Sequence, residues 1–233
     1  MKAKIGTIFV IFIALVLAIV ILTGLFYGVP YFQERNQRLR DTFSFISIDG
    51  GIKILGYSDD ILLSNNGNLV IPNRINGKKV IEIGKNAFAY NSYVKTVTIP
   101  STVKYIGDRA FYDCENLEEV EFGTNVESIG ESAFALCEGL KEVNIPKKVS
   151  KIKTETFLGC HSLTFLTIHE NVKVIEKNAF SQCTNLNNVE FENNNGWQLS
   201  NGNIVVDIKL TSSLVNANYV TMTYTNYIWL YVG

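Results

Sequence analysis

The cysteines are the residues whose type and spacing first suggest chemistry. There are four of them in 233 residues, and each lies 23 residues from the next. They are Cys114, Cys137, Cys160 and Cys183. Four thiols could form a zinc site, disulfides, or a nucleophile beside one of the two histidines, His161 and His169. The choice among a zinc site, disulfides and a nucleophile depends on the secondary structure elements that position the thiols.

The same 23-residue period runs through the apolar residues, which indicates an internal repeat. One unit is IGESAFALCEGLKEVNIPKKVSK, residues 129–151. The most regular columns are Ile83, Ile106, Ile129, Ile152 and Ile175, and Phe88, Phe111, Phe134, Phe157 and Phe180. No insertion interrupts the pattern through five units, so every unit should adopt the same local structure.

Each unit has two halves with different apolar spacing. The half L-x-x-V-x-F, residues 117–122, alternates apolar and polar side chains at its end, as a short strand does. The half A-F-x-x-C-x-x-L, residues 133–140, has the spacing of one face of a helical turn. We therefore expect an α/β repeat solenoid, with short parallel strands on a concave face and helical turns on the convex face. The six expected strands lie near 69–71, 97–99, 120–122, 143–145, 166–168 and 189–191.

A solenoid places the four cysteines in a line, with neighbouring thiols about 5 Å apart. A zinc ion needs its sulfur ligands about 2.3 Å away around a single point, so a straight line of thiols provides no metal site. A disulfide would require one coil to twist, because stacked side chains point the same way. His161 follows Cys160, but adjacent residues of a helical turn face different directions. We expect four buried free thiols.

The repeat resembles a known family. The pattern I-G-x-x-A-F-x-x-C-x-x-L-x-x-V-x-I-P-x-x-V-x-x is similar to the BspA-type leucine-rich repeat, closely over residues 69–191. The resemblance implies a bacterial surface or secreted protein used for adhesion or protein binding. The departures from the pattern include Asn91 in the cysteine column, Lys153 in the glycine column and Thr156 in the alanine column.

The N-terminus predicts a membrane segment. Residues 5–27 contain no charged side chain, and a helix of this length spans about 34 Å, enough to cross a bilayer. We interpret the segment as an uncleaved transmembrane signal-anchor helix of a single-pass protein. The count of positive charges on the two sides is nearly equal. Because the short basic prefix, residues 1–4, is typical of the start of an export signal, we expect a cytoplasmic N-terminus and an extracytoplasmic repeat domain. Cleavage of a long signal peptide, and secretion, is the alternative.

The remaining chain divides by composition and pattern. Five 23-residue repeats form the centre, a stalk precedes them, and a cap stands at each end because a terminal coil cannot bury both of its faces. The boundaries are 28–42 for the stalk, 43–82 for the N-terminal cap and first irregular coil, 83–195 for the repeats and 196–233 for the C-terminal cap. Hairpins are expected at 43–57 and at 196–208.

Charge and motifs exclude several classes of function. Residues 1–40 carry a net charge of +4, which leaves −5 for residues 41–233, and an acidic body argues against nucleic acid as a partner. No G-x-S-x-G, H-E-x-x-H or phosphate-binding loop motif occurs in the sequence. We therefore expect a protein that is not an enzyme and uses no cofactor.

The strand residues that alternate with the core should face outward on the concave side. They are Thr96, Thr98, Glu119, Glu121, Glu142, Asn144, Phe165, Thr167, Asn188 and Glu190. The centre of this face is acidic, with one aromatic residue, Phe165, beside it. We expect the face to bind a protein or glycan ligand. The alternative is a structural or self-assembling spacer at the membrane that binds no foreign ligand.

Overall fold

The computed structural model describes residues 38, 42–58, 66–193, 195–202, 205–208, 213–223 and 225–232. Its main compact unit runs from Thr42 to Gly233. No helix in these described ranges is long and apolar enough to cross a membrane. The predicted membrane segment 5–27 lies outside them, as does nearly all of the predicted stalk.

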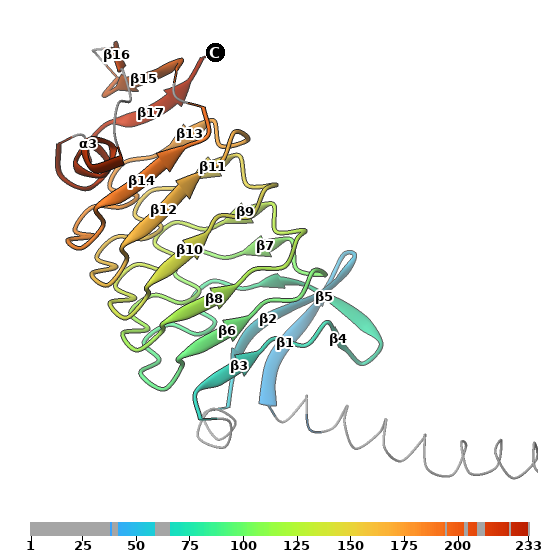
Figure 1. Cartoon of the computed structure of the whole chain (residues 1–233). Coiled ribbons are helices and arrows are strands. Elements are labelled where there is room, and N and C mark those ends of the chain that lie inside the picture. Colours follow the sequence, from blue (N-terminus) through green and yellow to red (C-terminus); the bar gives the residue numbers. More distant parts are fainter. Residues whose placement is uncertain are drawn as a thin grey trace, which may run out of the picture. The chain divides into compact units, whose positions relative to one another are not determined.

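The unit is a solenoid whose coils stack short parallel strands (Figure 1). The first ladder consists of β3 (Asn68–Val70), β6 (Thr96–Thr98), β8 (Glu119–Glu121), β10 (Glu142–Asn144), β12 (Phe165–Ile168) and β14 (Asn188–Phe191). Each strand begins one residue earlier than expected and is built around the predicted valine or leucine column. The column residues are buried because a strand turns every second side chain to the same side.

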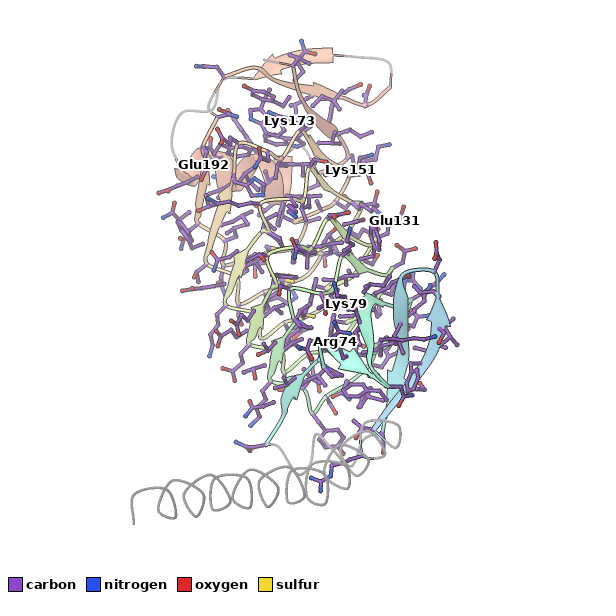
Figure 2. The ribbon with its side chains drawn as sticks, turned by 90° about the vertical axis from the view of Figure 1, so that its right-hand side faces the viewer. Arg74, Lys79, Glu131, Lys151, Lys173 and Glu192 are labelled. Atoms are coloured by element: carbon purple, nitrogen blue, oxygen red, sulfur yellow. The ribbon has the colours of Figure 1, made fainter. Side chains whose placement is uncertain are left out.

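A second ladder, which the sequence pattern did not predict, follows one side of the coils. It consists of β5 (Lys78–Ile83), β7 (Tyr105–Ile106), β9 (Ser128–Ile129), β11 (Lys151–Ile152) and β13 (Val174–Ile175). These strands contain the isoleucine column, whose side chains point into the core. The charged residues Arg74, Lys79, Lys151 and Lys173 can be located on this side in Figure 2.

The predicted helical turns are wrong, and with them the α/β assignment of the repeats. Residues 130–137 form overlapping tight turns, in which the N–H groups of Ala133 and Cys137 donate to carbonyls three residues earlier. Ser132 and Leu136 have φ of 51° and 61°, a left-handed conformation that a right-handed helix cannot include. The Phe134 N–H instead donates to a carbonyl of the next coil, at 2.9 Å. The repeats between 83 and 193 contain no helix.

Stacked aromatic rings form the centre of the core. Phe88, Phe111 and Phe134 follow one another with ring centroids 5.1 Å apart and interplanar angles of 9° and 6°. Phe157 and Phe180 continue the stack at 5.6 and 5.5 Å. Each coil therefore presents one ring to its neighbours, and no ring in the stack is exposed.

The four cysteines are free and buried, as predicted. Each thiol donates a hydrogen bond to the carbonyl of a phenylalanine one coil back, for example Cys137 to Phe111 at 3.1 Å. Burial raises the pKa of the Cys137 and Cys160 thiols well above the ordinary value. In the same column, the Asn91 side chain accepts the N–H groups of Tyr93 and Val94, both at 2.8 Å.

Antiparallel strands close both ends of the stack. At the N-terminal end, β1 (Phe43–Ile48) and β2 (Gly51–Tyr57) form the predicted hairpin, and β2 pairs with β5. A short strand, β4 (Arg74–Ile75), pairs antiparallel with the first residues of β5, Lys78 and Lys79. The open end of the first regular coil is therefore covered by strands and is not exposed to solvent.

At the C-terminal end, β15 (Trp197–Ser200) and β16 (Val205–Ile208) form the second predicted hairpin. The last strand, β17 (Ile228–Tyr231), lies between β15 and β13. The segment predicted as a short helix or strand, 210–224, contains helix α3 (Ser213–Asn218) and the π-helical turn η1 (Tyr219–Thr223). Helix α3 packs on β14 and covers the end of the first ladder.

Candidate functional site

The predicted binding residues all lie on the outer side of the first ladder, which we call the ladder face. In β8 and β10 two exposed side chains flank a buried valine, and the other ladder strands repeat the alternation with exposed or partly exposed side chains. The five exposed residues are Glu119, Glu121, Glu142, Asn144 and Glu190. The five partly buried ones are Thr96, Thr98, Phe165, Thr167 and Asn188.

The strand register decides which of these residues are neighbours. In the N-terminal half, Thr96 lies beside Glu119 and Thr98 beside Glu121. In the C-terminal half, the aromatic residue Phe165 lies between Glu142 and Asn188. Its side chain is half-buried among these neighbours, so it is less available than the sequence suggested.

The ladder face is interrupted in the middle, where a continuous six-stranded sheet was expected. The strands form two separate sheets, β3-β6-β8 and β10-β12-β14, and no strand pairing joins β8 to β10. The second ladder stops at the same junction, between β9 and β11. On the turn side the coils stay joined, since Ser132 and Phe134 donate to carbonyls of the next coil at 3.0 and 2.9 Å.

A single bulky side chain explains this opening. Phe122 stands in a column whose other members are Ile99, Ile145, Ile168 and Phe191 of the last coil, and it is the one member that is not buried. Its ring leans toward the following coil and meets the ring of Phe134 edge-on, at 5.6 Å between centroids. The ring thus occupies space between two coils, and we attribute the missing strand pairing to this wedge.

Charge acts in the same direction as the wedge. Glu119 and Glu142 hold equivalent positions on β8 and β10, and like charges directly opposite each other destabilise a strand pair. By contrast, Glu118 accepts a hydrogen bond from Lys141 of the next coil, and this contact lowers the pKa of the Glu118 carboxyl. Among the described residues, Glu118 therefore has a cation partner, whereas no ion pair is formed by Glu119 or Glu142.

The interruption creates a groove, which we call the β8–β10 groove. Its larger part has a volume of about 650 Å³, and a smaller part of about 340 Å³ adjoins it through shared lining residues. Apolar side chains of Val120, Phe122 and Ile145 line the larger part. Lys147 and Lys148 lie at the end of the groove beyond the strands.

Sequence reasoning found the acidic residues of this site but missed the groove. The missed lining residues are Phe122, Ile145, Pro146, Lys147 and Lys148. A signal existed, since Phe122 and the central phenylalanine column must compete for space in adjacent coils. A sequence pattern alone does not say whether such competition is relieved by repacking or by separating strands.

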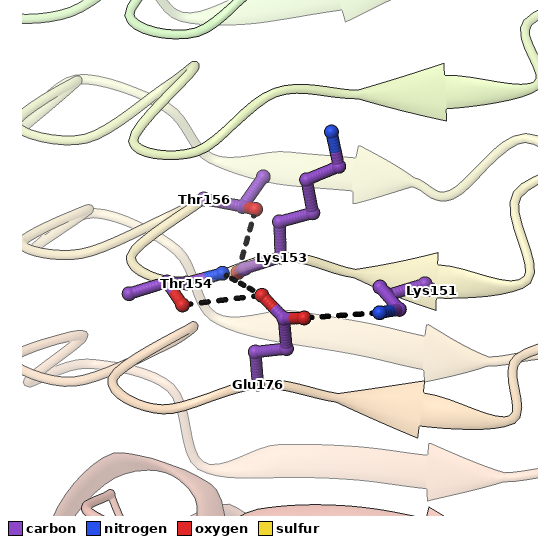
Figure 3. Close-up of polar contacts among 5 residues, drawn as sticks. All are labelled: Lys151, Lys153, Thr154, Thr156 and Glu176. Carbon is purple, nitrogen blue, oxygen red and sulfur yellow. Dashed lines mark hydrogen bonds and ion pairs between the residues drawn. The ribbon is translucent and has the colours of Figure 1, made fainter.

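A second polar cluster has a structural explanation (Figure 3). Glu176 accepts hydrogen bonds from the Lys151 ammonium at 3.1 Å, and from the Thr154 N–H at 3.0 Å and hydroxyl at 3.1 Å. Partial burial raises the pKa of Glu176, but these hydrogen bonds outweigh it, so the pKa lies below its usual value. The Thr156 hydroxyl donates to the Lys153 carbonyl at 2.8 Å. The cluster joins two coils, because Lys151 and Thr154 belong to one coil and Glu176 to the next.

The two histidines make local polar contacts. His169 is buried, with Nε2 3.1 Å from the Pro146 carbonyl oxygen and Nδ1 accepting the Asn171 N–H at 3.2 Å. His161 lies near the Thr184 hydroxyl, at 3.4 Å. Within the described ranges, no group of three or more histidine, cysteine or acidic residues could hold a metal ion.

The stacked strands, the repeating phenylalanine core and the two caps define a leucine-rich repeat solenoid. The family model for the BspA-type leucine-rich repeat region matches residues 74–199 in six copies. The chain therefore belongs to the BspA-type leucine-rich repeat family. No match to a curated protein was found.

Solved structures support the same assignment. The chain is similar to a leucine-rich repeat protein of T. pallidum, with 29% identity, a TM-score of 0.59 and coverage of 64% of this chain and 68% of that one. It is also similar to a leucine rich cell surface protein of Faecalibacterium prausnitzii, with 31% identity, a TM-score of 0.54 and coverage of 64% of this chain but 40% of that one. This is a repeat protein of the bacterial surface type, and such proteins are typically binding or structural modules rather than enzymes.

Proposed function

We propose that this chain is a membrane-anchored, extracytoplasmic module that binds another protein through its ladder face. The observation that carries the proposal is the β8–β10 groove, an opening in an otherwise regular and closed stack, with unpaired acidic side chains around apolar ones. A regular stack that served only as a spacer would need no such opening.

The dimensions of the face support a protein ligand. Six strands about 4.8 Å apart span about 24 Å, which is wide enough for a contact of about 800 Å² per partner. The alternating side chains lie on short strands that are held at both ends by hydrogen-bonded turns. The side chains and backbone therefore lose little conformational entropy on binding. A glycan remains the alternative ligand class, and a glycan array would detect it.

Anchoring is part of the proposal because residues 5–27 have the length and composition of a membrane span. The N-terminus then lies in the cytoplasm and the repeats lie outside. Protease added to intact cells should digest the repeats, whereas repeats that resist until the cells are lysed would contradict this orientation. If the segment is cleaved instead, the purified mature protein will lack it, which N-terminal sequencing would reveal.

Binding is tested by reversing charge on the ladder face. The double variant Glu121→Lys/Glu142→Lys should lose partners that the wild-type chain captures from the cell surface. The matched control, Glu131→Lys/Glu138→Lys, makes the same charge change at exposed residues away from the ladder face and should capture normally. Equal capture by both variants would contradict the proposal, and concentration-dependent self-association in light scattering would favour the spacer alternative.

A further inference from the structure

We propose that the β8–β10 groove receives an extended, basic polypeptide segment that inserts a large apolar side chain over Phe122. This rests on the proposed function and specifies the seat and the chemistry of the partner. The groove runs along the junction from Glu118 to Thr124, a stretch of about 20 Å at about 3.3 Å per residue. About six residues of an extended chain fit along it.

The floor of the groove selects an apolar side chain. Phe122 is partly exposed, although the other members of its column are buried, and Val120 and Ile145 adjoin it. An aromatic or long aliphatic side chain placed here would complete the packing that the separated strands leave open. Apolar anchors that fill a central pocket and exclude water contribute most of the binding energy of typical interfaces.

The rim of the groove selects a cation. Glu119, Glu121 and Glu142 are exposed, and the described part of the chain offers their carboxylates no hydrogen bond or ion pair. An incoming lysine or arginine between Glu119 and Glu142 would offset the repulsion between these two carboxylates. Arginine has a further advantage because its planar guanidinium can stack on the Phe122 ring.

The far end of the groove carries the opposite charge. Lys148 donates to the Asn125 side chain at 2.7 Å, but the described residues provide no partner for the Lys147 ammonium, which is exposed. The groove therefore has a net acidic end on the strands, where Lys141 pairs with Glu118 alone, and a basic end beyond them. A segment with its basic residues at one end fits in one direction only.

The inference is tested with the full-length chain in detergent and three synthetic nine-residue peptides. The first has a central tryptophan flanked by lysines, the second has serine in place of tryptophan, and the third has glutamate in place of the lysines. Fluorescence anisotropy at low salt should show the first peptide binding at least about tenfold more tightly than either of the others. Its affinity should fall as salt rises, because the rim charges are exposed.

Two variants connect this binding to the groove. Phe122→Ile restores the column residue and should allow the strands to close, which would weaken the first peptide about tenfold or more. Glu119→Gln/Glu142→Gln leaves the core unchanged and should remove most of the salt dependence. The control Glu131→Gln/Glu138→Gln should bind as the wild type does. Circular dichroism of each variant verifies folding, and the rim variant is decisive if Phe122→Ile misfolds.

Equal binding of the three peptides, or unchanged binding by the rim variant, would overturn the inference. If none of the peptides binds while charge reversal on the ladder face still abolishes protein capture, this inference fails and the proposed function stands. If the charge reversal also has no effect on capture, both fail.

Discussion

The glycine near the start of each of the first three repeats leads to a sharp prediction about how closely the coils approach. Gly84, Gly107 and Gly130 occupy this column in the first three repeats, and Lys153 and Glu176 occupy it in the last two. A Cβ atom at Gly130 would lie 2.4 Å from the Asp108 nitrogen. Ordinary contact begins at about 3.4 Å, so the backbone of one coil would have to move by about 1 Å.

The cost of Gly130→Ala follows from this distance. Forcing an extra methyl group into a packed interior typically costs about 1–3 kcal/mol, and the contact here is with rigid backbone rather than with a flexible side chain. Alanine also reduces the entropy of the unfolded chain, which returns about 0.4–1 kcal/mol. We expect a net loss of roughly 1–2 kcal/mol in the free energy of unfolding.

Urea unfolding followed by circular dichroism measures this loss, and the melting temperature should fall by about 2–8 °C. The matched control is Lys153→Ala, at the equivalent place in a coil that already accommodates a Cβ atom, and it should change the free energy of unfolding by less than about 0.5 kcal/mol. The reasoning is refuted if Gly130→Ala is as stable as the wild type, or if Lys153→Ala is equally damaging.

Three further predictions concern single side chains. A water-soluble thiol reagent should modify none of the four cysteines until urea unfolds the chain, and rapid labelling of one native thiol would show that burial does not protect it. Asn91→Ala should lower the free energy of unfolding by about 1–3 kcal/mol, because two N–H groups lose their acceptor, whereas the exposed Asn116→Ala should cost less than about 0.5 kcal/mol. Glu176→Gln should destabilise the protein at pH 7. The folded-state pKa of Glu176 lies below its ordinary value near 4.5, so this stabilisation is complete above that value and is lost as pH falls through the folded-state pKa. The difference in the free energy of unfolding between wild type and variant should therefore be smaller at pH 3 than at pH 7, and a difference that stays constant would contradict the assignment.

The repeat period predicted the coil, the buried columns and the strand positions because each column must fill the same place in every coil. It did not predict the turns correctly. The spacing of Ala133, Phe134, Cys137 and Leu140 fits one face of a helix. Ser132 and Leu136 have a positive φ, but serine and leucine are not the residue types that favour this conformation, so the sequence gives no sign of it. Only the contact with the next coil, which takes the N–H of Phe134, shows why tight turns replace a helix.

The groove was beyond sequence reasoning for a related reason. The pattern placed Glu119 and Glu142 correctly on one face, but it treated Phe122 as one more apolar residue in its column. Whether that ring is accommodated depends on the space left by Phe134 in the following coil, which is a property of the packed structure. A column pattern shows which side chains share a position and does not show how much room each of them has.

The opening of the ladder face leaves the centre of the solenoid intact. The rings of Phe111 and Phe134 lie on either side of the junction, and their centroids are 5.1 Å apart, the same as in the coils before it. The turn side also keeps its hydrogen bonds across the junction. The strain of the Phe122 wedge is therefore confined to the two ladders, where strand pairing is lost, while the buried core that holds the coils together is retained. One bulky residue in a column of mostly isoleucine can in this way open a groove in a repeat protein, while the regular stacking of the core is kept.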